Sequence, residues 1–204
     1  MSREIVLASN NAGKLAEFRQ LFAEHAIDFI PLSQFSAESV DEVGLTFVEN
    51  AILKARNACR QSGLPAIADD SGLEVYALQG APGIYTARYG GENATQEMRH
   101  AKLLQALADT PMSERGARFR CVLVYLQHYD DPSPIICEGD WEGLIALAPA
   151  GGNGFGYDPI FYVPEKSCTS AQLPEAEKHR LSHRGKALRQ LLARLTERHR
   201  KVVA

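Results

Sequence analysis

The spacing of apolar positions changes several times along the 204 residues, and each change predicts a new element. Continuous or alternating apolar runs predict strands, and apolar residues three and four positions apart predict amphipathic helices. The predicted strands are residues 4–9, 27–32, 66–68, 73–78, 118–127, 135–146 and 159–163. The predicted helices begin at residue 14, cover residues 47–62, 94–108 and 173–181, and resume after Ser182 as a C-terminal helix.

The order of these elements indicates the fold class. Strands and helices alternate early in the chain, and a turn at residues 130–134 joins two long strands into a hairpin. Alternation favours parallel strands and a hairpin pairs antiparallel ones, so we expect an α/β fold with a mixed sheet. No repeat or linker interrupts the pattern, and residues 1–204 suit one domain, which can fold as two lobes.

The helix predicted from residue 47 carries the clearest start signal. Thr46 and Glu49 stand three residues apart, the spacing of a capping box, in which each side chain bonds a backbone N–H of the other residue. Along this helix Asn50, Lys54 and Asn57 recur at helical spacing. We therefore expect a polar stripe on one side of the helix.

Composition narrows the possible functions. Hydrophobic residues make up 45% of the chain and charged residues 23%, which excludes wholesale disorder. The formal net charge of −3 excludes a basic surface over the whole protein, of the kind that binds nucleic acid or a membrane, but leaves room for a local basic site. The apolar run at residues 5–8 is too short for a signal peptide, and no stretch reaches the ~20 apolar residues of a membrane span. We expect a cytoplasmic protein without membrane or nucleic-acid partners.

Cysteines and histidines give no sign of a zinc site. The four cysteines lie far apart without a C-x-x-C motif, so we expect small buried thiols at Cys59, Cys121, Cys137 and Cys168. The histidines without ligand spacing are expected at the surface or in the core, namely His25, His100, His128 and His199.

Four polar or glycine-rich segments follow predicted strands, where ligands collect in open α/β sheets. The first segment consists of Ser9, Asn10, Asn11, Ala12, Gly13 and Lys14. Backbone N–H groups at a helix N-terminus, together with one lysine, can hold a phosphate. The segment lacks both the Walker A and the G-x-G-x-x-G patterns, so an ordinary strand–helix turn is the alternative.

The second segment is acidic and is predicted as a loop that follows a buried strand. It contains Asp69, Asp70, Ser71 and Gly72. Carboxylates at the edge of a buried sheet are costly unless they are paired or bind a metal, and adjacent residues of an extended chain point in opposite directions. One acid can therefore bind Mg²⁺ or act as a general base, while the other bonds and supports the neighbouring backbone. A capped turn is the alternative. The acidic loop at residues 38–42 can add a second carboxylate, although spacing alone favours a solvated loop.

The third segment, residues 151–158, is rich in glycine and contains Phe155, Gly156, Tyr157 and Asp158. Glycines allow close approach of the backbone, and an aromatic ring between them can stack on a planar group such as a nucleobase. A following aspartate can accept hydrogen bonds from ring N–H groups. The alternative is a turn with Phe155 in the core.

The fourth segment is basic. Lys178, His183 and Arg184 stand before and at the start of the C-terminal helix. Cations are unfavourable at the positive end of a helix dipole, so an anion nearby would resolve the arrangement. A solvated basic face is the alternative. Taken together, the four segments indicate a nucleoside polyphosphate site, and the absence of a G-x-S-x-G motif disfavours acyl chemistry.

At these residues the sequence resembles the inosine triphosphate pyrophosphatase family. Six blocks match it in order along nearly the whole chain, a highly specific signal. The blocks are Ser9 to Lys14; Gly44 to Ala51 with Lys54 and Ala55; Ala68 to Leu73; Gly80 to Tyr89; Gly154 to Phe161; and Glu177 and Lys178 with Ser182 to Arg184. Departures are mild: Thr86 and Tyr76 differ from frequent family residues, and residues 91–116 and the chain after Leu195 match poorly.

The resemblance implies an elongated, two-lobed α/β fold around a long mixed sheet, with the substrate in a cleft between the lobes. It also implies a homodimer and Mg²⁺-dependent hydrolysis of ITP, dITP and XTP to the monophosphate and pyrophosphate. The implied phosphate-binding residues are Lys14 with the loop before it and, nearby, Lys54. The implied metal ligands are Asp70 and Glu42, of which Glu42 competes with Asp41. Asp70 resembles the general base, Asp69 supports it, and Ser71 contacts the substrate. The residues implied to contact base and sugar are Phe155 to Asp158, Lys178, His183 and Arg184.

Two other functions stay open. A related pyrophosphatase of the Maf-like group would act on other modified nucleotides. A non-catalytic nucleotide- or RNA-binding module would favour a strongly basic stripe, whereas the net charge is −3 and two adjacent acids would repel a polyanion unless a metal is present. The preference among ITP, dITP and XTP and the means of rejecting GTP are not predicted.

Overall fold

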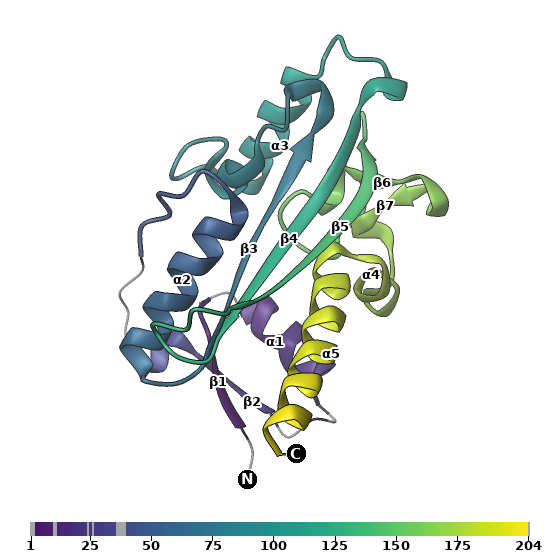
Figure 1. Ribbon diagram of the computed structural model, residues 1–204. Coiled ribbons are helices and arrows are strands. Elements are labelled where there is room, and N and C mark those ends of the chain that lie inside the picture. The colour runs from purple at the N-terminus through teal and green to yellow at the C-terminus, as the bar shows by residue number, and fades with distance from the viewer. Residues whose placement is uncertain (1–2, 10–11, 24, 26, 36–39, 204) are drawn as a thin grey trace. The chain divides into compact units, whose positions relative to one another are not determined.

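A computed structural model describes residues 3–9, 12–23, 25, 27–35 and 40–203 (Figure 1). The helices are α1 (Ala12–Leu21), α2 (Phe47–Ser62), α3 (Gln96–Ala106), α4 (Glu175–Leu181) and α5 (His183–Val203). The strands are β1 (Arg3–Leu7), β2 (Ile27–Pro31), β3 (Ala66–Val75), β4 (Gly116–Leu126), β5 (Ile135–Ile145), β6 (Phe161–Val163) and β7 (Cys168–Thr169).

The strands of the described chain form one seven-stranded sheet in the order β2-β1-β3-β4-β5-β6-β7. Strand β1 pairs in parallel with both β2 and β3. At the other end, β5 with β6 and β6 with β7 are antiparallel pairs. The predicted α/β fold with a mixed sheet is confirmed.

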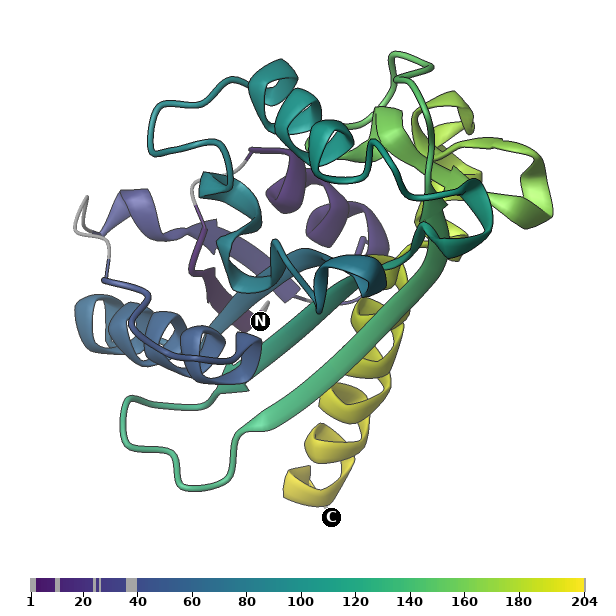
Figure 2. The same ribbon diagram turned by 90° about the horizontal axis from the view of Figure 1, so that it is seen from above.

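Helices α1 and α2 cover opposite faces of the parallel part of the sheet. The chain leaves β1 in one direction to reach β2, then returns across β1 to reach β3, and right-handed crossovers place the two connecting helices on opposite faces. Phe18 of α1 and Leu191 of α5 pack in one core with Ile5 and Leu7 of β1. Val6, the residue between them, points the other way and is equally buried. Figures 1 and 2 show α2 on the other side of β1 from α1.

The chain divides into two compact units that alternate along the sequence. The first unit contains residues 1–70, 121–138 and 186–204, and the second contains residues 71–120 and 139–185. Each unit has its own hydrophobic cluster, the first around Phe18, Phe22 and Phe29 and the second around Trp141 and Phe161. That residues 1–204 act as one domain stays a prediction.

The acidic segment forms neither the loop that the sequence predicted nor the alternative capped turn. Residues 66–68 and 73–78 were expected to be separate strands, but β3 runs without interruption from Ala66 to Val75 and contains both Asp69 and Asp70. Polar residues and Gly72 favour a loop when the sequence is judged alone. A sheet can hold the same residues in extended form if their polar side chains find hydrogen-bond or charge partners. The strand ends in a short 3₁₀ turn, Tyr76–Leu78.

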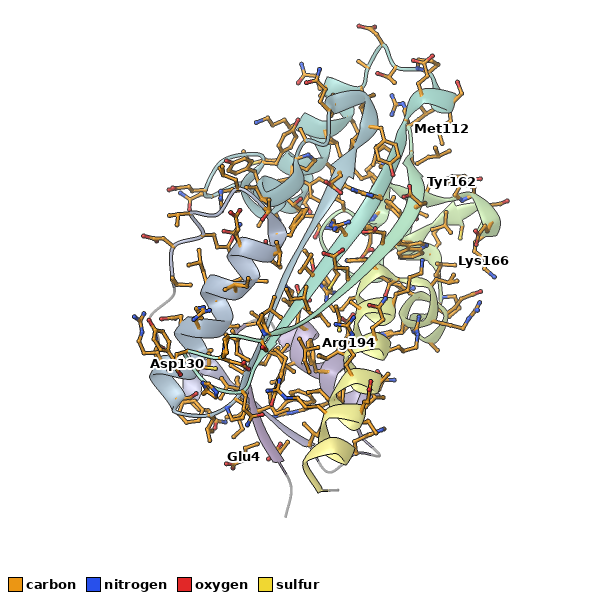
Figure 3. All side chains as sticks on the ribbon, viewed as in Figure 1. Glu4, Met112, Asp130, Tyr162, Lys166 and Arg194 are labelled. Atoms are coloured by element: carbon orange, nitrogen blue, oxygen red, sulfur yellow. The ribbon has the colours of Figure 1, made fainter. Side chains whose placement is uncertain are left out.

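Other element boundaries lie close to their predictions. Helix α1 begins two residues before the predicted start, and the two-residue strand β7 was not predicted. Thr46 caps α2 by accepting a hydrogen bond from the backbone N–H of Glu49, as predicted. The turn between β4 and β5, which contains Asp130 (Figure 3), is held to α2 because Arg56 donates to the carbonyl of Tyr129 at 3.0 Å.

Cys59, Cys121 and Cys137 are buried, as expected for small core thiols, whereas Cys168 is only half-buried. In the part of the chain that the structure describes, no helix has the length and apolar character needed to cross a membrane.

Candidate active site

Two adjacent carboxylates lie in the middle of β3 and point in opposite directions. Asp69 and Asp70 are only 1% and 7% exposed. One oxygen of Asp69, Oδ1, accepts a hydrogen bond from Lys14 at 2.5 Å, and its other oxygen lies 3.6 Å from the Cys121 sulfur. Asp70 instead faces α2, where Lys54 donates to its Oδ1 at 2.6 Å. The alternation of an extended chain therefore assigns the two acids to different lysines.

Lys54 joins three acceptors from two segments. Its ammonium group lies 2.6 Å from Asp70 Oδ1, 3.0 Å from Glu42 Oε1 and 3.0 Å from the carbonyl oxygen of Asp69. Asp41, the other candidate for the second carboxylate, is exposed. The structure thus brings Glu42 to Lys54 and Asp70, and this arrangement favours Glu42 over Asp41 as the second acid of the site.

The electrostatics of this group follow from burial and charge pairing. Burial alone would lower the pKa of Lys54, but the carboxylates of Asp70 and Glu42 outweigh it, so the pKa of this ammonium group is raised. Burial also raises the pKa of Asp70, an effect that Lys54 only partly offsets. A carboxylate with a raised pKa accepts a proton more readily than an ordinary aspartate.

The Glu42 loop is anchored to the first turns of α2 by contacts that the sequence did not predict. Asn50 is buried and its Oδ1 accepts the backbone N–H of Gly44 at 2.8 Å, while Glu49 accepts the backbone N–H of Leu45 at 2.9 Å. A side chain at Gly44 would lie 2.7 Å from Asn50 Oδ1, so the close approach requires glycine. The polar stripe of α2 is therefore not a solvated face: Asn50 and Asn57 are buried, and Lys54 points into the acidic group.

The donor set of this group suits a divalent metal ion. Asp70 Oδ2 is buried and accepts no hydrogen bond from any described residue, an unusual state for a carboxylate oxygen. Two lysines against three carboxylates leave Lys14, Lys54, Asp69, Asp70 and Glu42 with a formal charge of −1, which repels a polyphosphate until a cation is added.

Mg²⁺ is usually held by one or two carboxylates and completes its shell with water and substrate phosphate. Among the described residues, no group of three or more His, Cys, Asp or Glu side chains is arranged to hold a metal. Asp70 and Glu42 are the two carboxylates at Lys54 that could serve as protein ligands of such an ion.

The predicted phosphate loop leads into the N-terminus of α1. Ser9 follows β1 and is half-buried, Gly13 is exposed, and Lys14 stands in the first turn of the helix, which begins at Ala12. Asn10 and Asn11 lie outside the described residues. The backbone of α1 therefore presents its first N–H groups next to Lys14, as the phosphate-binding prediction requires.

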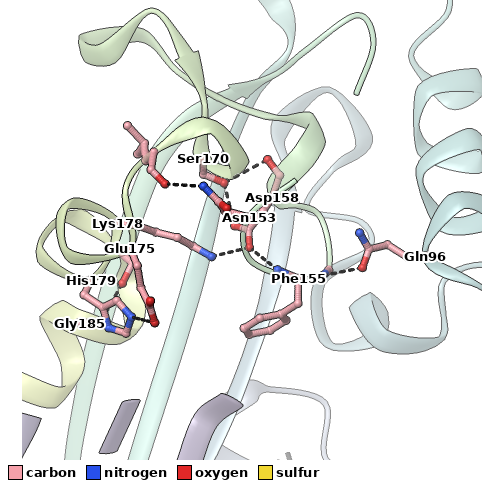
Figure 4. Close-up of polar contacts among 12 residues, drawn as sticks. Gln96, Asn153, Phe155, Asp158, Ser170, Glu175, Lys178, His179 and Gly185 are labelled. Carbon is pink, nitrogen blue, oxygen red and sulfur yellow. Dashed lines mark hydrogen bonds and ion pairs between the residues drawn. The ribbon is translucent and has the colours of Figure 1, made fainter. Parts of the chain in front are cut away.

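In the second unit, the glycine-rich loop carries one aromatic ring, and hydrogen bonds from side chains hold the backbone of this loop (Figure 4). Phe155 is 42% exposed, which contradicts the alternative that it belongs to the core. Asp158 is buried, and its Oδ2 accepts the Phe155 N–H at 2.8 Å and the Lys178 ammonium at 2.5 Å. Its Oδ1 accepts the Ser170 hydroxyl at 2.7 Å. A side chain at Gly154, where φ is +79°, would collide with Asp158 and Lys178.

The two residues between Phe155 and Asp158 are engaged by the protein itself. Gly156 has φ +63° and bonds through both its N–H and its C=O to side chains of α3. Tyr157 is buried, and its hydroxyl donates to the carbonyl of Thr86 at 3.1 Å. Burial raises the pKa of Tyr157 to about 12, so this phenol stays protonated near neutral pH. The substrate contacts predicted for Gly156, Tyr157 and Asp158 stay predictions.

Two cations flank the exposed ring. The Lys178 ammonium lies 5.4 Å and the Arg184 guanidinium carbon 5.5 Å from the centroid of Phe155. Arg184 and His183 are buried, and the His183 ring stacks on Phe119 at 4.8 Å. Ser182 caps α5, since its hydroxyl accepts the Gly185 N–H at 3.0 Å. The basic segment is therefore packed around Phe155 rather than spread over a solvated face.

Comparison with known proteins decides the family. The sequence pattern of the Ham1 family matches residues 5–194. The chain belongs to the Ham1 family.

Relatives of this Ham1-family chain resemble it over nearly its whole length. It is 55% identical to a dITP/XTP pyrophosphatase of Vibrio vulnificus, over 96% of this chain and 98% of the relative. It is 54% identical to a dITP/XTP pyrophosphatase of Shigella flexneri, over 93% and 96% of the two chains. The structure of a HAM1 protein from Coxiella burnetii superposes with a TM-score of 0.91 at 54% identity, covering 96% of this chain and 99% of that one. The family inferred from the motifs is confirmed.

Several residues that shape the site of this Ham1-family chain escaped the sequence analysis. Asn50 and Gly44 hold the Glu42 loop, Ser170 braces Asp158, and Gln96 on α3 bonds Gly156. The sequence placed Asn50 only in the polar stripe of the helix, and the burial that accompanies its supporting role is visible only in the structure. For Ser170 and Gln96 no signal exists in the sequence, because their partners are 12 and 60 residues away.

Proposed function

We propose that the chain is a nucleoside triphosphate pyrophosphatase that hydrolyses non-standard purine nucleotides, dITP, ITP and XTP, to the monophosphate and pyrophosphate. Such an activity would remove these nucleotides from the pool before they enter DNA or RNA. The observation that carries the reaction type is the buried Asp70 carboxylate, whose Oδ1 accepts from Lys54 and whose Oδ2 bonds none of the described residues. The substrate class is supported by the two relatives named dITP/XTP pyrophosphatase, at 54–55% identity over nearly the whole chain.

The reaction joins a water oxygen to the α-phosphorus and breaks the bond from that phosphorus to the oxygen that bridges to the β-phosphorus. Asp70 orients the attacking water and takes its proton, and a general base of this kind contributes about a hundredfold to ten-thousandfold in rate. Its raised pKa suits this role. Asp69 acts indirectly, because its carboxylate fixes Lys14 and its carbonyl fixes Lys54.

The lysines offset the negative charge that develops on the leaving pyrophosphate. We assign this role to Lys14 and Lys54. Asp70 and Glu42 would hold Mg²⁺, which supplies charge screening on the phosphate oxygens. Oδ1 of Asp70 already accepts from Lys54, but a carboxylate offers about four lone-pair sites, so Asp70 can contribute both to metal binding and to proton transfer.

Base recognition is assigned to the second unit. Phe155 offers a face on which a purine can stack, and Lys178 and Arg184 lie beside this ring. We assign polar contacts with the base or sugar to Lys178, His183 and Arg184, and a contact with the substrate to Ser71. A hydrogen-bond donor of the protein can bond the 6-oxo group of hypoxanthine or xanthine. The same donor would face the 6-amino group of adenine, which is itself a donor. An unpaired buried donor of this kind costs ~1–3 kcal/mol, which is about tenfold to over a hundredfold in selectivity.

The activity is tested by measuring pyrophosphate and orthophosphate released from a panel of triphosphates with Mg²⁺. The panel contains dITP, ITP, XTP, dGTP, dATP, UTP and 7-methyl-GTP. We expect pyrophosphate, not orthophosphate, and rates with dITP and XTP at least tenfold above those with dATP. Faster turnover of the pyrimidine or methylated nucleotides would support a Maf-like activity instead. Binding without turnover of any triphosphate would contradict an enzyme.

Arg184→Ala is expected to reduce the preference for dITP over dATP by about tenfold, because the guanidinium group beside Phe155 is assigned to base recognition. The measurement is the ratio of kcat/KM values for the two nucleotides. Arg180→Ala on neighbouring α4 is the matched control, since Arg180 is exposed. A preference equal to that of the wild type in a folded Arg184→Ala protein would contradict the assignment.

Assembly and location follow from the resemblance alone. We propose a homodimer that works in the cytoplasm on small nucleotides, without nucleic-acid or membrane partners. Equilibrium sedimentation of the purified chain measures the assembly directly.

A further inference from the structure

One helix of the second unit holds both polar atoms of a single loop residue. Gln96 and His100 stand four residues apart on α3, so their side chains lie on the same helical face. The Gly156 N–H donates to Gln96 Oε1 at 3.1 Å, and the Gly156 carbonyl oxygen lies 2.7 Å from His100 Nε2. A carbonyl can only accept, so Nε2 of His100 carries the hydrogen.

His100 is built into the fold rather than exposed. It is 6% exposed, and its ring packs against that of Tyr157 at 5.7 Å. The glycine that it holds has φ +63°, a conformation that other residues rarely adopt. The pair on α3 therefore fixes a conformation that the loop sequence permits but does not by itself enforce.

These contacts complete a set that fixes the backbone on both sides of Phe155. The peptide before Phe155 is held by Asp158, whose Oδ2 accepts the Phe155 N–H. The peptide after Phe155 contains the Gly156 N–H and is held by Gln96 (Figure 4). When both flanking peptides are fixed, the direction of the Phe155 Cα–Cβ bond is fixed as well, and Lys178 and Arg184 beside the exposed ring restrict its rotation.

We propose that Gln96 and His100 are positioning residues that set the orientation of Phe155 and thereby the affinity and selectivity for the purine base. The inference rests on the proposed function, in which a purine stacks on this ring. Stacking itself tolerates any base, but the plane of the ring determines where the edge of the base meets its polar partners. A loosened ring would weaken binding of the base while leaving the reaction at the phosphate unchanged.

The test compares Gln96→Leu and His100→Leu with Gln105→Leu, the same kind of change at an exposed position of the same helix. Loss of either hydrogen bond to Gly156 is expected to raise the KM for dITP about three- to tenfold, with kcat within about twofold of the wild type. The preference for dITP over dATP falls in the same variants. Gln105→Leu is expected to behave as the wild type.

Product inhibition separates an effect on the base from general damage. The inhibition constant of dIMP, which carries the base, is expected to rise in parallel with KM, while that of pyrophosphate, which has no base, stays unchanged. His100→Gln places an amide N–H close to the position of Nε2 and is expected to restore most of the loss. The positioning role is contradicted if KM is unchanged, if dIMP and pyrophosphate weaken together, or if His100→Gln is no better than His100→Leu.

Hydrogen exchange at residues 153–158 tests, independently of activity, whether Gln96 and His100 hold the loop. Both leucine variants are expected to exchange faster there than the wild type and Gln105→Leu, and equal exchange would overturn the proposal. If the wild type hydrolyses no triphosphate, the proposed function fails, and the exchange comparison still decides whether α3 fixes the loop. If one leucine variant does not fold, the other provides the same comparison.

Discussion

Asp70→Asn is expected to lower kcat for dITP about a hundredfold to ten-thousandfold, because an amide cannot take the proton of the attacking water. The substitution preserves the shape of the side chain and its contact with Lys54. Lys54 also keeps Glu42 and the Asp69 carbonyl as acceptors. We therefore expect the free energy of unfolding to change by no more than about 2 kcal/mol. Steady-state pyrophosphate release and urea unfolding measure the two quantities.

Asp109→Asn is the matched control, since it makes the same chemical change at an exposed position. Its kcat should equal that of the wild type. A near-normal kcat in Asp70→Asn would remove the base role from Asp70. A large loss of kcat accompanied by unfolding would assign the residue to stability rather than to proton transfer.

Removal of divalent cations is expected to abolish turnover, because the charged group around Lys54 carries a formal charge of −1 and repels the triphosphate. EDTA should reduce pyrophosphate release to background, and excess Mg²⁺ should restore it. Turnover that persists in EDTA after exhaustive dialysis would contradict metal dependence.

The Glu42→Gln variant tests where Mg²⁺ binds, and the measurement is the Mg²⁺ concentration that gives half the maximal rate. If Glu42 and Asp70 hold the metal, loss of one carboxylate should raise the Mg²⁺ concentration for half-maximal rate about tenfold or more, while saturating Mg²⁺ recovers much of kcat. Asp41→Gln removes the neighbouring exposed acid and should leave the requirement unchanged. The reverse pattern would assign the metal to Asp41.

The sequence predicted most elements because their signals are local. The capping box at Thr46 and Glu49 and the apolar spacing of α5 depend on residues within one or two helical turns. The error at Asp69 and Asp70 has the same origin. A local rule places polar residues and a glycine in a loop, whereas Lys14 and Lys54 stabilise the two acids inside a strand from positions 55 and 16 residues away.

The family motifs identified the chemistry of the site but not its support. Lys54, Asp69, Asp70 and Phe155 were recognised as residue types suited to phosphate, proton transfer and stacking. Which acid accompanies Lys54 depends on the path of the Glu42 loop, and that path is set by Asn50 and Gly44. Such contacts require two backbones to approach closely, a condition that spacing along the chain does not report.

By itself, the sequence determined the α/β class, the family and the residue types that can act on a nucleoside triphosphate, because these follow from local periodicity and from contiguous motifs. Only the tertiary structure decided that both acids lie within one strand and face different lysines. It also decided that α3, some 60 residues earlier in the chain, holds the loop backbone next to Phe155. The physical reason is that charge pairing and the bonding of buried peptides depend on distances in space, which packing sets and sequence separation does not.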